Sequence, residues 1–149
     1  MVSLDFPKYP LRIKSSKNKP LVFDPVRKKY VPLTPEEWVR QHCLHYLIRD
    51  RKYPAGRMLV ERQIKVAGME KRLDIGVCHP DGSVHLLVEC KAPEIVIDQK
   101  VFDQIARYNW QVRADLLMVT NGLSHYYCRM DYVQKRYSFL QDLPPFRLG

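Results

Sequence analysis

The sequence predicts a single α/β domain in which helices cover a mixed central sheet. The chain has 149 residues and 46% hydrophobic content, which suits one folded domain with one hydrophobic core. Two segments with helical periodicity alternate with short apolar runs that are typical of strands. The element order is helix, three strands, helix, strand and strand. A strand–helix–strand crossover after a meander implies a mixed sheet with helices on its faces.

The first helix begins at a clear start signal. Thr34 is the expected cap, Pro35 takes the first helical position, and Glu37 stands where it would complete a capping box. Apolar residues then recur at helical spacing, and the helix should end between residues 50 and 53, before Pro54.

The remaining elements follow from apolar runs and turn residues. We expect a strand over 57–66, a hairpin with strands over 70–78 and 84–91, a helix over 98–113, and strands over 116–120 and 125–130. Residues 1–33 are basic and proline-rich and predict an irregular or extended arm with short strands. Residues 34–130 form the expected core, and residues 131–149 form an aromatic and basic tail.

The hairpin is the most informative segment. If Asp81-Gly82 is a two-residue turn, opposed residues have numbers that sum to 163, so Asp74 lies opposite Glu89. Lys91 shares the face of Glu89 because side chains alternate along a strand. Opposed residues have Cβ atoms roughly 4.5–5.5 Å apart, and two carboxylates that close repel unless a proton or a cation lies between them. A hard divalent cation is the natural occupant.

Charge and composition narrow the class of partner and the compartment. The formal net charge of +9 favours a polyanionic partner such as nucleic acid, although a basic surface can also serve solubility alone. The four cysteines show no C-x-x-C spacing, which argues against a zinc or dithiol motif. No apolar run reaches the roughly 20 residues of a membrane span, and no signal peptide is evident at the N-terminus. We therefore expect a cytoplasmic protein without a membrane segment.

Asp74 followed by Glu89-x-Lys91 resembles the restriction-endonuclease-like nucleases, which are named for their PD-(D/E)xK motif. The chain is more narrowly similar, over about residues 34–130, to the N-terminal nuclease domain of type I restriction enzyme R subunits. Five stretches carry this resemblance: Thr34 to Gln41, Arg72 to Ile75, Val88 to Pro93, Gln104-x-x-x-Tyr108-Asn109, and Val119 to Gly122. Leu73 replaces the proline of the motif's name, which is a common variation.

The resemblance implies a role for each matching residue. Asp74 and Glu89 would ligate Mg²⁺ or Mn²⁺ together with the carbonyl oxygen of Cys90. Lys91 would contact the attacking water or the scissile phosphate. Three further residues would support the site: Glu37 on the first helix, and Gln104 and Tyr108, which match the Gln-x-x-x-Tyr motif of nucleases coupled to motors. Glu61, on the preceding strand, is a further candidate acid.

These observations lead to three function hypotheses. The first is a Mg²⁺-dependent DNA endonuclease (a phosphodiester hydrolase) that acts in restriction-modification. The second is a non-cleaving nucleic-acid-binding or interaction subunit built on the same fold. The third is a structural protein in which Asp74, Glu89 and Lys91 are ordinary ion pairs. The motor that follows this domain in type I R subunits is not in the sequence, so we expect a chain that works alone, works with a separate motor or specificity subunit, or is a truncated or orphan copy. The resemblance also allows a homodimer.

Overall fold

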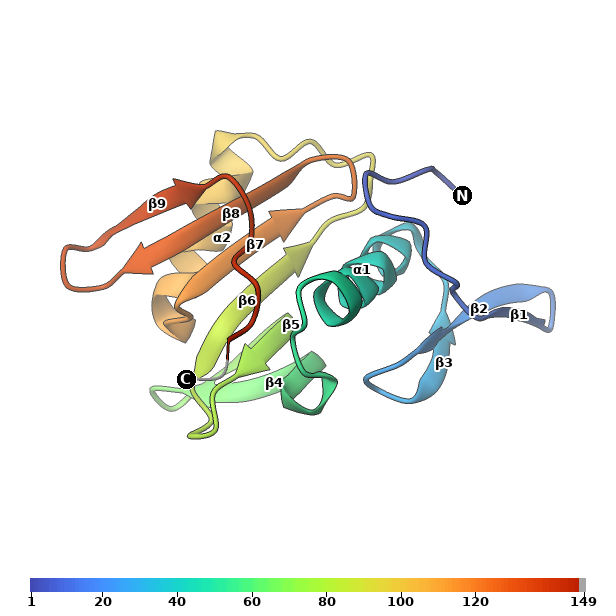
Figure 1. Cartoon of the computed structure of the whole chain (residues 1–149), viewed down its shortest axis with the longest axis horizontal. Helices are drawn as coiled ribbons and strands as arrows, with labels where there is room; N and C mark the ends of the chain where they lie inside the picture. Colours follow the sequence, from blue (N-terminus) through green and yellow to red (C-terminus); the bar gives the residue numbers. More distant parts are fainter. Residues whose placement is uncertain (148–149) are drawn as a thin grey trace.

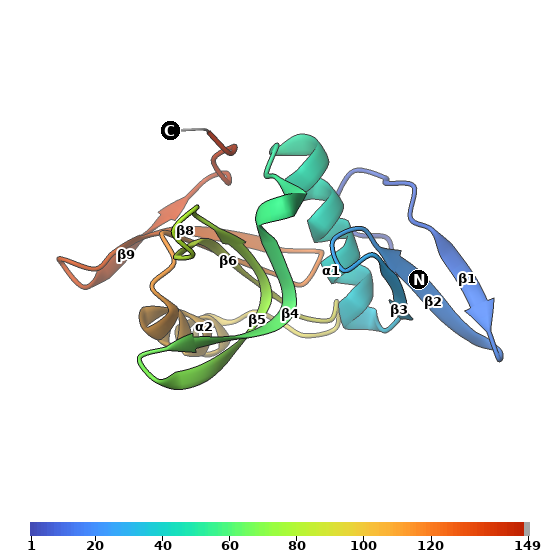
Figure 2. The same cartoon turned by 90° about the horizontal axis from the view of Figure 1, so that it is seen from below.

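The computed structural model, which describes residues 1–147, has a mixed six-stranded sheet with one helix against each face (Figures 1 and 2). The strands lie in sequence order: β4 (Met58–Val66), β5 (Met69–Cys78), β6 (Val84–Cys90), β7 (Leu116–Thr120), β8 (His125–Asp131) and β9 (Arg136–Leu140). Strands β6 and β7 are parallel, and the other neighbours are antiparallel. The mixed sheet flanked by helices is therefore confirmed.

Both helices begin where the sequence predicts. Helix α1 (Pro35–His45) is capped by the Thr34 hydroxyl, which accepts from the Glu37 N–H at 3.1 Å, and it continues as a π-helical turn over Tyr46–Asp50. Helix α2 (Gln99–Val112) is capped by Asp98, which accepts from the Val101 N–H at 2.9 Å. Within residues 1–147, neither helix has both the length and the apolar composition that crossing a membrane requires.

Each helix packs on its own hydrophobic core. Successive residues of β6 and β7 alternate between the two cores, as expected for strands covered on both faces. Leu86, Val88 and Met118 belong to the core under α1, whereas Leu87 and Leu117 belong to the core under α2. Strands β6 and β7, which the α2 crossover connects, therefore lie side by side in the middle of the sheet with both faces buried.

Two parts of the architecture exceed the predictions. The N-terminal arm contains an antiparallel three-stranded sheet of β1 (Ile13–Ser16), β2 (Lys19–Asp24) and β3 (Lys29–Pro32), which stands beside α1 and apart from the central sheet (Figure 1). The aromatic tail contributes strand β9, which pairs with β8. The tail's last two residues lie outside the described residues.

The predicted two-residue hairpin turn is wrong, yet the predicted opposition of the strands is right. The loop spans five residues, His79 to Ser83, and is closed by a hydrogen bond of 2.8 Å from the His79 N–H to the Ser83 carbonyl. Cys78 therefore pairs with Val84, one residue out of the expected register. The register shifts back at a bulge next to this pair, so Ile75 opposes Val88 and the next positions are Asp74 and Glu89.

Strand β5 changes its face at Asp74. Residues two apart on a regular strand share a face, but Leu73 packs in the core under α2 and Ile75 in the core under α1. Opposite this point on β4, Glu61 has a positive φ of 51°, which costs a side-chain-bearing residue about 1–2 kcal/mol. The pairing of β5 with β6 ends at Ile75, so the two strands separate where the predicted acids lie.

Candidate active site

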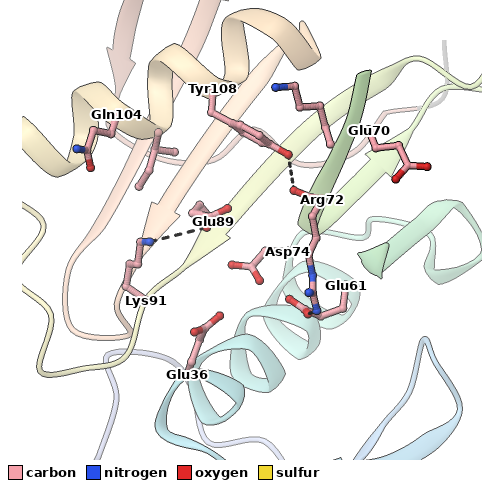
Figure 3. A pocket seen from close by; sticks show the side chains of 11 residues that line it. Glu36, Glu61, Glu70, Arg72, Asp74, Glu89, Lys91, Gln104 and Tyr108 are labelled. Carbon is pink, nitrogen blue, oxygen red and sulfur yellow. Dashed lines mark hydrogen bonds and ion pairs between the residues drawn. The ribbon is translucent and has the colours of Figure 1, made fainter. Parts of the chain in front are cut away.

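A cleft of about 610 Å³ opens where β5 and β6 separate, between the N-terminal turn of α1 and the middle of α2 (Figure 3). Its walls are mostly charged or polar. Five acidic and three basic side chains line it together with three others: Glu36, Glu61, Glu70, Asp74 and Glu89; Lys71, Arg72 and Lys91; Gln104, Ile105 and Tyr108. The cleft is therefore acidic although the chain as a whole is strongly basic.

Asp74 lies at the base of this cleft with only 5% of its side chain exposed. One carboxylate oxygen accepts from the Cys90 N–H at 2.7 Å and so replaces the backbone partner that β5 no longer provides. The other oxygen accepts from Arg40 Nη2 at 2.6 Å. Burial raises the pKa of Asp74 to about 6, although the Arg40 charge opposes the shift.

Arg40, on α1, is the cation at the centre of the acidic residues. Besides Asp74, its Nη2 atom donates to Glu36 at 2.8 Å and to Glu61 at 2.9 Å, while Nη1 donates to Glu37 at 2.8 Å. Burial lowers the pKa of Arg40, but the Asp74 and Glu37 charges outweigh burial and raise it overall. A single nitrogen thus has three carboxylate oxygens around it.

Glu89 and Lys91 lie on the opposite wall, at the end of β6. Lys91 Nζ is 4.0 Å from Glu89 Oε1, and the side chains are 35% and 24% exposed, respectively. Burial, followed by the Asp74 charge, raises the pKa of Glu89 to about 8, and Lys91 only partly offsets this. The raised pKa favours the protonated form of Glu89, and a bound cation would favour the ionised form instead.

Glu61 links the inner acids to the rim of the cleft. Its carboxylate accepts from both Arg40 and Arg72, and Arg72 is largely exposed. Although burial raises the pKa of Glu61, hydrogen bonding with Asp74, followed by the charges and hydrogen bonding of the two arginines, lowers it overall. The pKa of Glu61 is thus shifted in the opposite direction to that of Asp74.

Helix α2 supplies the remaining wall. Gln104 and Tyr108 are four residues apart, share one face of the helix and both line the cleft (Figure 3). The Tyr108 hydroxyl donates to the Arg72 carbonyl, which ties α2 to β5 across the opening.

The structure brings together five of the predicted site residues, namely Asp74, Glu89, Lys91, Gln104 and Tyr108. The N–H of Cys90 points toward Asp74, and the C=O of a strand residue points to the same side as its N–H. Glu37 is the exception, because its buried carboxylate accepts from Arg27, Arg40 and Gln41 behind the cleft. Its neighbour Glu36 lines the cleft instead.

Sequence reasoning missed Arg40 and Glu36 as site residues. The available signal was the helical spacing of Glu36, Glu37 and Arg40, because residues three and four apart lie on one helix face. Glu70, Lys71 and Arg72 were also missed, since nothing in the strand pattern indicates that this end of β5 borders a cleft.

The residues fit a hard divalent cation. Within residues 1–147, the carboxylates of Glu36, Glu61 and Asp74 can each offer an oxygen such that these atoms lie within 4.8 Å of one another. The Nη2 atom of Arg40 lies among these three carboxylates and supplies positive charge at the place where a cation would bind. An all-oxygen donor set of carboxylates, with a backbone carbonyl nearby, suits Mg²⁺ or Mn²⁺.

The first prediction concerns Arg40. Arg40→Met should lower the free energy of unfolding, measured by urea denaturation in EDTA, by roughly 3–5 kcal/mol, because it leaves buried carboxylates without their counter-charge. Arg62→Met, on the exposed part of β4, is the matched control and should change little. A loss below about 1 kcal/mol for Arg40→Met would show that these acids do not depend on the guanidinium.

The second prediction concerns pH. When the pKa of a carboxyl group is higher in the folded state than in the unfolded state, the free energy of unfolding falls as the pH rises. The loss occurs between the pKa of the unfolded state and the pKa of the folded state. For Glu89 that window runs from 4.5 to about 8. Glu89→Gln should therefore match the wild type near pH 4 and exceed its free energy of unfolding by roughly 1–3 kcal/mol at pH 8 in EDTA. Glu94→Gln, an exposed control, should show no such gain. Parallel pH profiles for Glu89→Gln and the wild type would contradict the assignment.

Comparison with known proteins identifies the family of the chain. Residues 35–144 match the family model of the type I restriction enzyme R protein N terminus. The match begins at the first residue of α1 and includes both helices and all six strands of the central sheet. No curated protein and no solved structure matches the chain significantly. Because the family model covers well over half of the sequence, the chain belongs to the family of type I restriction enzyme R protein N-terminal domains.

Proposed function

We propose that the chain is a metal-dependent DNA endonuclease domain that hydrolyses phosphodiester bonds with Asp74, Glu89 and Lys91. The observation that carries this proposal is their convergence on one cleft in a member of a restriction-enzyme family. The residues come from strands β5 and β6 and the segment after β6, and the separation of β5 from β6 at Asp74 opens the cleft that they line.

Electrostatics favours a cation in this cleft. A polyanion entering a cleft with five acidic and three basic side chains would be repelled unless positive charge is added. We propose that Asp74 and Glu89 hold Mg²⁺ or Mn²⁺, with Glu61, Glu36 and the Cys90 carbonyl as further oxygen donors. When bound, such an ion lowers the pKa of a coordinated water and neutralises charge on the phosphate.

The chain's own residues then have distinct roles. Lys91 would place its ammonium beside the phosphate, where negative charge develops during hydrolysis. Gln104 and Tyr108 line the opposite wall and would orient the nucleic acid backbone. Arg40 would position the Asp74 carboxylate through its hydrogen bond and would balance the negative charge of the neighbouring acidic residues.

The small sheet supplies a surface for the rest of the nucleic acid. Arg12 lies over the Phe23 ring at 4.5 Å, and Lys14 lies over the Tyr30 ring at 3.9 Å. Both cations are exposed, and the neighbouring Lys17, Lys19, Lys28 and Lys29 are exposed as well. Such a basic surface contacts phosphates without reading sequence, so we propose weak intrinsic sequence specificity.

The third prediction tests cleavage. The full chain, incubated with Mg²⁺ or Mn²⁺ and plasmid, linear or single-stranded DNA, should cut at least one of these substrates. Lys91→Ala should reduce the rate by about 100-fold or more, because it removes a charge that stabilises the transition state. Lys100→Ala removes an exposed lysine outside the cleft and should keep the wild-type rate.

The outcomes separate the alternatives. Metal-dependent cutting that Lys91→Ala leaves unchanged would refute the site assignment. Salt-sensitive DNA binding with no cutting under any of these conditions would favour the non-cleaving subunit. The family implies other subunits, so a motor or specificity subunit is the partner to add in that case.

The fourth prediction tests the surface of the small sheet. The double variant Arg12→Ala, Lys14→Ala should weaken binding to duplex DNA and reduce the slope of log affinity against log salt by up to about 2, which is roughly 0.9 per lost phosphate contact. Arg136→Ala is the control, because β9 lies at the opposite end of the molecule (Figure 1). Fluorescence anisotropy at several salt concentrations measures both. An unchanged slope in the double variant would exclude this surface.

A further inference from the structure

A second cluster of ligand-type side chains lies at the other end of the central strands. It consists of His79 in the loop after β5, His85 at the start of β6, and Asp115 immediately before β7. His79 Nε2 is 2.6 Å and His85 Nδ1 is 3.0 Å from the same carboxylate oxygen of Asp115. Each of the three offers a ligand atom within 4.8 Å of the others.

The fold holds these three residues together through backbone features. The loop His79 to Ser83 places His79 beside β6, and the register shift of the hairpin lies next to His85. Strand β7 pairs in parallel with β6, so its beginning lies beside the beginning of β6, where Leu86 pairs with Leu116. The Asp115 carbonyl accepts from the Met130 N–H at 3.0 Å, which anchors the backbone of Asp115.

We propose that His79, His85 and Asp115 form a second metal site, for a transition-metal dication such as Zn²⁺. Two imidazoles and one carboxylate match the three protein ligands that Zn²⁺ takes when it keeps a fourth position open. Tetrahedral ligands at zinc bond lengths of about 2.0–2.2 Å lie about 3.4 Å apart. The present separations of 2.6 and 3.0 Å therefore have to widen by less than about 1 Å.

The donor set separates this site from the cleft. Imidazole suits Zn²⁺, Ni²⁺ and Cu²⁺, whereas Mg²⁺ prefers oxygen ligands. The two histidines and Asp115 are 40%, 25% and 50% exposed, respectively, so the ion can enter from solvent. Glu89 follows His85 by four residues along β6, so at about 3.3 Å per residue the two sites lie more than about 10 Å apart. The ion would fasten the β5–β6 loop to the start of β7 and stabilise the fold without contacting the cleft.

Zinc titration of the full chain tests the proposal. Isothermal titration calorimetry with ZnCl₂ should show one high-affinity equivalent, and Zn²⁺ should raise Tm by several degrees because it binds only the folded site. His79→Gln and His85→Gln should each weaken binding by more than about 100-fold, since loss of an outer partner alone costs 10–100-fold. Both variants should retain the metal-free Tm within a few degrees, because the two rings are partly exposed.

Two controls make the result specific. Asp74→Asn, in the cleft, and Cys78→Ser, beside His79, should both retain the zinc equivalent. Absence of zinc binding by the wild type would overturn the proposal, and so would one equivalent that persists in both histidine variants. Loss of the equivalent in Asp74→Asn alone would place the ion in the cleft and also overturn it. None of these readouts depends on DNA cleavage.

Discussion

The arrangement of the site depends on one buried guanidinium. Arg40 is 5% exposed and contacts Glu36, Glu37, Glu61 and Asp74, so the net charge beneath the cleft depends on it. A buried pair contributes little net stability compared with apolar packing, but an unpaired buried charge is costly. Helix α1 is therefore restrained in its rotation and height on the sheet, because any displacement that removes Arg40 from the acids leaves them uncompensated. Glu37 extends the chain of ion pairs to Arg27 and Asp24 of the N-terminal sheet.

The second constraint lies in the central sheet, where the pairing of β5 with β6 ends at Ile75. Where β5 leaves β6, the Asp74 carboxylate accepts the Cys90 N–H that a backbone carbonyl would otherwise accept. A carboxylate fixed by two hydrogen bonds and buried has a defined direction, and this is what a metal ligand requires. The left-handed backbone of Glu61 is consistent with this view, since strained residues persist where the surrounding structure holds them.

The sequence predicts the parts that follow from local rules. The start of α1 follows from Thr34, and the opposition of Asp74 and Glu89 follows from hairpin pairing, even though the turn was assigned incorrectly. The bulge next to His85 adds one residue to β6 and restores the register that the longer loop shifts by one. No local sequence pattern around His85 indicates this bulge. Strand β9 and the pairing of the short N-terminal strands into a sheet were not predicted, because their stability comes from pairing partners and not from a strong apolar alternation. The role of Arg40 depends on contacts 21 and 34 residues away, which helical spacing alone does not reveal.

Parallel pairing of β6 and β7 explains why the chain can separate two kinds of chemistry. The ends of these strands carry Glu89 and Thr120, and the beginnings lie beside His85 and Asp115. The first end brings the Glu89 carboxylate into a cleft beside Asp74 of β5, and carboxylate oxygens are ligands that suit a hard cation. The second end presents imidazole nitrogens, which a hard cation does not favour. Under the two proposals, the same two strands would hold donor sets of different chemistry at their opposite ends, so a structural ion at one end would not compete with a catalytic ion at the other.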